Sequence, residues 1–173
     1  MYAVRGFTLW ELVCAIGIAA ALIGIGTPAL TGFLLDGRRT ADVKALVLAV
    51  QLARSEAAKR GRPVIVCPSR DRVSCGGAFT AGFMVFVNLD DEYPPARTDA
   101  EPLLYAHAPE LTGAITTNRP YYEFRPGRRR SVNGTVVFCD RRGAAAARAV
   151  IVSYTGRPRV SDRDADGQPL RCA

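Results

Sequence analysis

Two arginines near the C-terminus, Arg157 and Arg159, are the residues of this sequence whose type and spacing best suit the binding of an anionic ligand. Gly156 before them allows a tight turn, and Pro158 between them restricts the backbone from which both side chains project. A planar guanidinium pairs well with phosphate, and arginines on a fixed loop can grip successive phosphates without reading bases. The segment therefore predicts a phosphate-binding site, and the alternative is a turn with solvated arginines.

The basic charge of the chain is concentrated in its C-terminal third. Residues 1–118 carry no net charge, whereas residues 119–173 hold 12 Arg and 5 acidic residues and thus the whole net charge of +7. This asymmetry indicates an anionic partner or else a solvated, arginine-rich surface. Candidate extensions of the arginine pair are Arg128, Arg129, Arg130, Arg141, Arg142, Arg163 and Arg171. Asp162, Asp164 and Asp166 oppose the first interpretation, because they would repel phosphate if they lay beside the arginines.

Other kinds of chemistry find little support in the sequence. His107 is the only histidine and lies in an apolar run, so we expect a structural role for it. Nucleophile motifs, phosphate-binding glycine loops and clusters of metal ligands are missing. Residues 162–167 carry alternating aspartates, but no glutamate closes a calcium loop of the usual length. We therefore expect a protein that is not an enzyme and has no cofactor or metal.

The five cysteines divide into two groups. Cys14 lies within an apolar N-terminal segment, whereas Cys67, Cys75, Cys139 and Cys172 lie beyond it. An even number of cysteines outside such a segment favours disulfide bonds in an oxidising compartment. A zinc site is the alternative, but it usually shows closely paired cysteines or several histidines, which this chain lacks.

The N-terminal segment differs from a secretory signal peptide, in which a short apolar stretch precedes the cleavage site. Here the candidate cleavage site precedes the apolar stretch. Residues 12–35 contain no charged side chain and are long enough to span a bilayer core as a helix. Gly6 and Phe7 precede this run, and Glu11 lies near its start. A carboxylate beside an apolar helix is costly unless it is paired. Cleavage after Gly6 would create an amine about one helical turn from Glu11, so Glu11 is predicted to serve subunit assembly.

The segment Gly6–Leu12 resembles the prepilin signature, in which a peptidase cuts after Gly6 and methylates the new N-terminal Phe7. The resemblance implies an inner-membrane protein with a single pass, which later joins other pilins or pseudopilins in a pilus or pseudopilus. The prepilin peptidase would be its first partner. The implied parts are a leader of residues 1–6, a transmembrane and assembly helix of residues 7–35, and a periplasmic head of residues 36–173.

The pattern of the remaining chain predicts an α+β head. A helix is expected over residues 41–60, because apolar residues recur there at three- and four-residue steps and Gly61 and Pro63 then end the pattern. This helix would continue the apolar segment as one long, bent helix. Strands are expected at Val64–Cys67, Phe83–Val87, Tyr121–Phe124, Thr135–Cys139 and Ala149–Tyr154.

Three segments of the head resemble the GspH/FimT family, which contains minor pilins and minor pseudopilins. They are Ala53–Ala57, Arg62–Pro68 and Gly82–Phe86. The likeness implies the pilin fold, in which a long N-terminal helix packs on an antiparallel β-sheet head. In this setting the expected disulfides are Cys67–Cys75 and Cys139–Cys172.

Within this family, the arginine pair also resembles a known DNA-binding motif. The Gly-Arg-x-Arg sequence formed by Gly156, Arg157 and Arg159 resembles the C-terminal motif of DNA-binding FimT proteins. The resemblance implies a minor type IV pilin that binds the DNA phosphate backbone non-specifically for uptake in natural transformation. The alternative is a GspH-like minor pseudopilin of a type II secretion system, with the same N-terminus and fold and no role in DNA binding.

Overall fold

A computed structural model of the chain describes residue 6 and residues 8–127 and 132–172, and for residues 25–29 it describes the backbone only. Within these residues the chain forms one α-helix, two short 3-10 helices and eight β-strands. Their bounds are α1 Leu9–Arg60, β1 Val64–Pro68, η1 Phe79–Ala81, β2 Phe83–Val87, β3 Leu103–His107, β4 Gly113–Thr117, β5 Tyr122–Phe124, β6 Gly134–Asp140, η2 Ala144–Ala146, β7 Arg148–Val152 and β8 Pro158–Ser161. The chain divides into two compact units, Met1–Gly37 and Arg38–Ala173.

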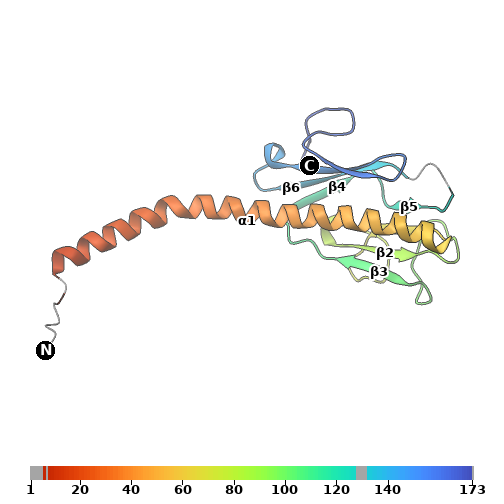
Figure 1. Ribbon diagram of the computed structural model, residues 1–173, viewed down its shortest axis with the longest axis horizontal. Helices are drawn as coiled ribbons and strands as arrows, with labels where there is room; N and C mark the ends of the chain where they lie inside the picture. Colours follow the sequence, from red (N-terminus) through yellow and green to blue (C-terminus); the bar gives the residue numbers. More distant parts are fainter. Residues whose placement is uncertain (1–5, 7, 128–131, 173) are drawn as a thin grey trace. The chain divides into compact units, whose positions relative to one another are not determined.

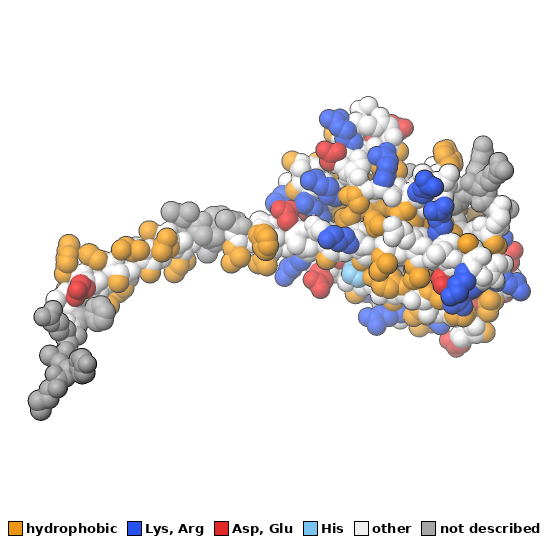
Figure 2. Space-filling model, viewed as in Figure 1, with side chains coloured by type: hydrophobic (Ala, Val, Ile, Leu, Met, Phe, Trp, Pro, Cys, Tyr) orange, Lys and Arg blue, Asp and Glu red, His pale blue; other side chains and the backbone are white. Residues whose placement is uncertain are grey.

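The first unit contains the beginning of α1. Thr8 and Glu11 form a capping box at the helix start, because the Thr8 N–H and hydroxyl both donate to Glu11 Oε2 at 2.9 Å. Eleven large apolar side chains of this unit are half or more exposed (Figure 2). They are Leu9, Trp10, Leu12, Val13, Ile16, Ile18, Leu22, Ile23, Leu30, Phe33 and Leu34. Among the residues described here, no helix combines the length and apolar character needed to cross a membrane.

The second unit begins with the remainder of α1, which confirms the predicted helix over residues 41–60. Its apolar stripe is buried, with Leu46, Val50 and Ala53 fully inaccessible to solvent. This burial accounts for the three- and four-residue periodicity of the sequence. The helix ends where Gly61 adopts a positive φ of 66°, a backbone conformation that glycine adopts without steric cost.

The strands of the second unit form two antiparallel sheets, each four-stranded within the described residues. Sheet A has the order β3-β2-β1-β5, and sheet B has the order β4-β6-β7-β8. In Figure 1, β4 and β6 lie along one side of α1, and β2 and β3 lie along the other. The long-helix, antiparallel α+β arrangement that the sequence implied is confirmed, with the strands divided between two sheets.

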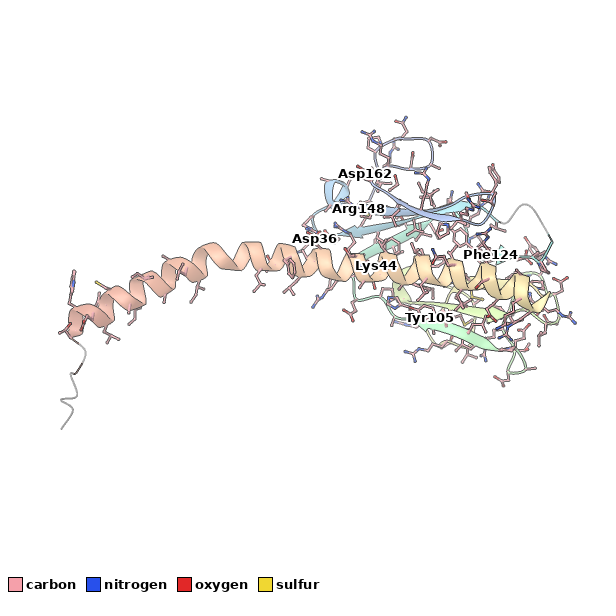
Figure 3. The ribbon with its side chains drawn as sticks, in the orientation of Figure 1. Asp36, Lys44, Tyr105, Phe124, Arg148 and Asp162 are labelled. Atoms are coloured by element: carbon pink, nitrogen blue, oxygen red, sulfur yellow. A yellow bond between two sulfur atoms is a disulfide. The ribbon has the colours of Figure 1, made fainter. Side chains whose placement is uncertain are left out.

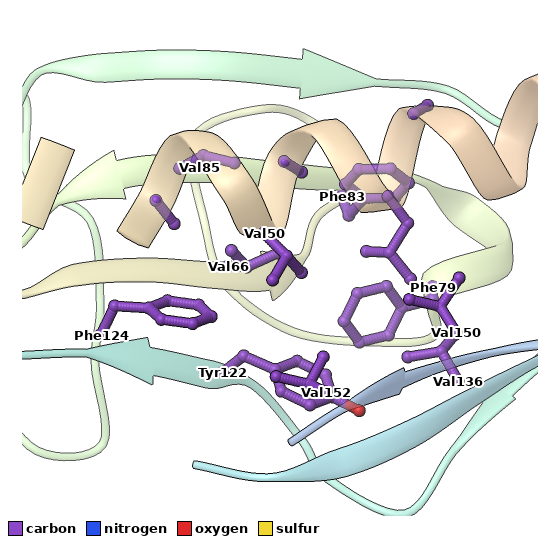
Figure 4. Packing of buried hydrophobic residues seen from close by; sticks show 14 of the residues in the cluster. Val50, Val66, Phe79, Phe83, Val85, Tyr122, Phe124, Val136, Val150 and Val152 are labelled. Carbon is purple, nitrogen blue, oxygen red and sulfur yellow. The ribbon is translucent and has the colours of Figure 1, made fainter. Parts of the chain in front are cut away.

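The main core lies where α1 meets both sheets. Figure 4 shows Val50 of α1 close to Val66 of sheet A, and both belong to one buried cluster with Val152 of sheet B. Aromatic rings fill the remaining space, with the ring centroids of Phe79 and Tyr122 6.3 Å apart in an edge-on arrangement. Burial of such rings supplies a large part of the hydrophobic stabilisation of a head of this size.

The two predicted disulfides are present in the second unit. Cys67 and Cys75 close a short loop after β1, with their Cα atoms 5.6 Å apart. Cys139 of β6 joins Cys172, with their Cα atoms 5.8 Å apart, and so attaches the C-terminal segment to sheet B. That segment covers the face of sheet B opposite the main core, where a smaller apolar cluster forms. Its buried members are Cys139, Ala147, Ala149, Ile151 and Leu170.

Buried polar contacts connect α1 to each of the two sheets. On the side of sheet A, the carboxylate of Asp42 is fully buried and contacts His107 of β3 at 2.7 Å. On the side of sheet B, Arg39 donates to the carbonyl of Ala146 and lies 3.8 Å from the carboxylate of Asp140. Buried charged groups are retained in proteins when they are paired in this way.

Asp140→Asn is expected to lower the free energy of unfolding by about 1.5–3 kcal/mol at pH 7, the usual value of hydrogen bonds to a charged group. Hydrogen bonding from the side chain of Arg142 lowers the pKa of Asp140 below its ordinary value, and the charge of Arg39 adds to this effect. A carboxylate with a lowered folded-state pKa stabilises the fold above its unfolded pKa and loses that contribution as the pH falls.

Urea unfolding from pH 7 down to pH 2 tests this prediction. The stability difference between the native chain and Asp140→Asn should narrow below about pH 4, where the unfolded carboxyl becomes protonated. A difference that stays constant throughout this range would contradict it.

Candidate nucleic-acid interface

The predicted arginine pair lies on the hairpin that joins β7 to β8. Its loop, residues 153–157, is closed by a hydrogen bond of 3.0 Å from the Ser153 N–H to the Arg157 carbonyl. The Gly156 N–H donates to the Ser153 carbonyl at 2.8 Å, and Gly156 has a φ of +72°. A turn followed by a glycine of positive φ is a common hairpin connection. Gly156 therefore sets the loop geometry that the sequence suggested.

Arg157 and Arg159 are both exposed, and their side chains leave the same face of the chain. The residue before a proline is restricted to extended backbone, so Arg157 continues the alternation of β8. Arg159 pairs with Ile151 of β7, whose side chain belongs to the cluster under the C-terminal segment. Over the described part of the chain, neither arginine takes part in an ion pair. Two guanidinium groups thus face solvent from a fixed backbone.

Several other arginines are already engaged by the protein. Arg125 forms ion pairs with Asp91 and Glu123 at 2.6 and 2.7 Å, and hydrogen bonding to Asp91 raises the pKa of Arg125. Arg142 contacts the carboxylate of Asp140 at 2.6 Å. Arg163 donates to a backbone carbonyl at 3.0 Å. The predicted contributors Arg128, Arg129 and Arg130 lie outside the described residues.

The aspartates that argued against a phosphate site lie away from the hairpin loop. The Asp164 carboxylate accepts hydrogen bonds from the N–H groups of Asp166 and Gln168, at 2.9 and 2.7 Å, which closes its own turn. Asp164 and Asp166 line a groove whose floor is β4 and β6, roughly 10 Å from β8 at ordinary strand spacing. In Figure 3, Asp162 lies near Arg148 and far from Phe124, which borders the hairpin loop. Repulsion of phosphate at the loop is correspondingly weak.

A further arginine near the hairpin, Arg54, was not among the predicted site residues. It lies on α1 and borders two surface hollows, one shared with Thr155 and the other with Pro158. The available signal in the sequence was its position off the apolar stripe of the helix. The sequence does not show that this helix face lies beside a hairpin about 100 residues further along.

The other predicted site residues lie in different parts of the chain. Gly6 is exposed and Phe7 lies outside the described residues, so the predicted cleavage and methylation stay predictions. Glu11 caps α1 through Thr8, a local role that the sequence interpretation overlooked despite the Thr-x-x-Glu spacing. His107 contacts Asp42 and has a structural role, as expected. In the described residues no group of three or more His, Cys, Asp or Glu side chains is placed to bind a metal.

A long N-terminal helix whose second half packs on antiparallel sheets is the architecture of a pilin. Residues 42–156 match the family described as Type II transport protein GspH, and because this match covers more than half of the chain, the chain belongs to that family. It is thus a pilin-like protein of the GspH/FimT group.

Two solved structures similar to this chain are crystal forms of the type IV minor pilin FimU from Pseudomonas aeruginosa. Both are 17% identical to it and cover 78% of its length. The first aligns over 99% of the FimU chain with a TM-score of 0.56, and the second over 94% with a TM-score of 0.53. At this identity the likeness establishes the fold. No protein of curated function matches the chain.

Proposed function

We propose that this chain is a minor type IV pilin that binds DNA non-specifically for uptake during natural transformation. Its family contains both pilus and secretion-system subunits, so membership in it fits either role. The observation that favours DNA is the exposed pair Arg157 and Arg159, held without ion pairs in the described structure on a hairpin shaped by Gly156. Two uncompensated guanidinium groups on a preformed loop suit the binding of an anionic polymer.

The chemistry of the site suits the phosphate backbone. Arg157 and Arg159 project from one face of extended backbone, so their guanidinium groups meet successive phosphates of one strand. The hairpin has no helix that would enter a groove, and phosphate contacts carry no sequence information. Binding is therefore non-specific and falls with salt, because each neutralised phosphate releases condensed counterions.

Assembly is the second part of the proposal. Cleavage after Gly6 and methylation of Phe7 by a prepilin peptidase would leave the mature chain in the inner membrane with a periplasmic head. Glu11 would then meet the N-terminal amine of its own or a neighbouring subunit, and the exposed apolar side chains of the first unit would pack against other pilins. The head would be carried into the pilus with its hairpin accessible.

Replacing Arg157 and Arg159 together by Gln is expected to weaken DNA binding about five- to tenfold at low salt. A plot of log affinity against log salt for duplex DNA should lose about 1.8 from its slope, since each phosphate contact contributes about 0.9. Fluorescence anisotropy with the purified full-length chain in detergent, over a series of salt concentrations, measures both quantities.

The loop between Cys67 and Cys75 provides a matched control. Arg70 and Arg72 are exposed, have the same two-residue spacing and lie in another disulfide-closed loop, so Arg70→Gln with Arg72→Gln removes the same charge elsewhere. This variant should keep most of the affinity and slope. Equal losses in both double variants would mean a diffuse charge effect, and the hairpin would then not be the site.

The pseudopilin alternative is supported by the description of the family itself, Type II transport protein GspH. It requires the same fold and assembly helix and no DNA contact. A native chain that fails to bind DNA at low salt would favour this role, as would secretion genes beside its own gene.

A further inference from the structure

The seam between α1 and the β7–β8 hairpin contains two adjoining hollows. One, of about 150 Å³, is bordered by Arg54 and Thr155. The other, of about 250 Å³, is bordered by Arg54 and Pro158. Ala58 lines both hollows, so they follow one another along the helix surface. The small side chain at this position leaves the seam open.

The electrostatic character of this seam is positive. Arg54 is exposed and has no ion pair among the residues that the structure describes. The nearest acid along the helix, Glu56, is engaged by Arg60 and Lys59. The described side chains that border the two hollows include no carboxylate, and Arg125 of the first hollow is compensated by Asp91 and Glu123. Among the residues described, Arg54 therefore supplies the uncompensated charge of the seam.

The position of β8 relates Arg54 to the arginine pair. In the part of the chain that the structure describes, sheet B ends at β8, so no described strand pairs with its outer edge. Pro158 borders the seam beside α1, whereas the neighbouring residue in β8, Arg159, points to the opposite face because side chains alternate along a strand. Uncompensated guanidinium groups thus lie on both faces of one edge strand. A ligand that contacts all three arginines must pass around that edge.

We propose that Arg54 and its seam extend the DNA site, and that single-stranded DNA is the form that occupies the whole of it. The proposal rests on the DNA-binding function proposed above. One sugar–phosphate strand lies along Arg157 and Arg159, turns around the edge of β8 and enters the seam. There Arg54 binds a phosphate, and the sugar packs over Ala58 and Pro158.

The stiffness of DNA selects the single strand. A turn around one β-strand must be completed within roughly 10 Å, the usual separation between packed layers. Duplex DNA has a persistence length of about 50 nm and cannot follow such a turn. A single strand can do so, and positively charged grooves that follow the backbone are typical of proteins that bind single strands. Duplex DNA would contact the outer arginine pair only.

The test compares single-stranded and duplex oligonucleotides of one length with the full-length chain in detergent. Arg54→Gln should weaken single-strand binding about three- to tenfold and lower the salt slope by about 0.7, while duplex binding changes less than twofold. Ala58→Leu fills the seam without removing charge and should also weaken single-strand binding selectively. Lys59→Gln removes the same charge from a side chain that contacts Glu56, and it should have little effect on either DNA.

The possible results distinguish the extended single-strand site from the DNA-binding function of the hairpin on which it rests. Loss of binding in Arg157→Gln with Arg159→Gln but not in Arg54→Gln would overturn the extended site and leave the hairpin site intact. Equal loss of single-strand and duplex binding in Arg54→Gln would overturn the assignment to single strands. A native chain that binds neither DNA would overturn the DNA-binding function itself.

Discussion

Asp42→Ala is expected to lower the free energy of unfolding of the chain by about 3–5 kcal/mol, because it removes the acceptor of three hydrogen bonds and each unsatisfied buried group costs about 1–3 kcal/mol. The carboxylate is fully buried on α1. Its Oδ1 lies 2.7 Å from Nε2 of His107 and accepts the Glu110 N–H at 3.1 Å, and its Oδ2 accepts the Leu111 N–H at 2.8 Å. Alanine would leave two backbone donors and a ring nitrogen without their acceptor, and it would remove the connection between α1 and the loop after β3.

Urea unfolding followed by circular dichroism measures this loss. Asp42→Asn is an intermediate variant, because its amide carbonyl keeps one acceptor in place. Its loss in free energy of unfolding should be smaller than that of Asp42→Ala. Asp71→Ala is a useful second control, since the described donors to Asp71 all lie within three residues of it along the chain, in the segment 69–74. A loss below about 1 kcal/mol for Asp42→Ala would mean that water replaces the carboxylate, and the proposed anchoring role would be wrong.

Replacing Cys139 and Cys172 together by Ser is expected to destabilise the chain by about 2–4 kcal/mol. The bond joins residues 33 apart and holds the segment that covers the outer face of sheet B, including the buried Leu170. Opening it restores freedom to a long stretch of the unfolded chain. It also frees the C-terminal segment that covers Ile151, the residue of β7 that pairs with Arg159 of β8.

The second disulfide serves as the comparison for this prediction. Cys67 and Cys75 are 8 residues apart, so chain entropy predicts a smaller loss of about 2.5 kcal/mol, against about 3.7 kcal/mol for the longer loop. Thermal and urea unfolding of both double variants would establish the order. Greater destabilisation from the shorter loop would contradict it. DNA binding should also fall in Cys139→Ser with Cys172→Ser, because the hairpin lies inside the longer loop.

The strands rich in Val, Ile and aromatic residues could be predicted, and three others could not. Val64–Pro68 and Phe83–Val87 are buried along their whole length, and their runs of β-branched and aromatic residues indicated this. Leu103–His107 is a half-exposed edge strand whose apolar run contains no β-branched residue and does not alternate with polar residues, so the sequence did not identify it as a strand. Pro158–Ser161 begins with proline, which usually argues against a strand and is tolerated here because β8 lies at a sheet edge.

The candidate site could be predicted where its parts are close in sequence. Gly156, Arg157 and Arg159 form a local pattern whose turn geometry follows from residue type. The pairing of Arg125 with Asp91 and the placement of Arg54 beside the hairpin depend on contacts between distant segments. The spacing of apolar and polar residues along one sequence contains no information on such contacts. For the same reason it did not show that the strands divide between two sheets.

The covalent ring from Cys139 to Cys172 has a practical consequence for anyone handling the protein. A protease that cuts the exposed hairpin loop would leave two pieces still linked through sulfur, so the nicked chain would migrate as intact protein on a non-reducing gel. Only thiol treatment before electrophoresis would release the short C-terminal fragment. Integrity checks on preparations used for DNA binding therefore need reducing gels.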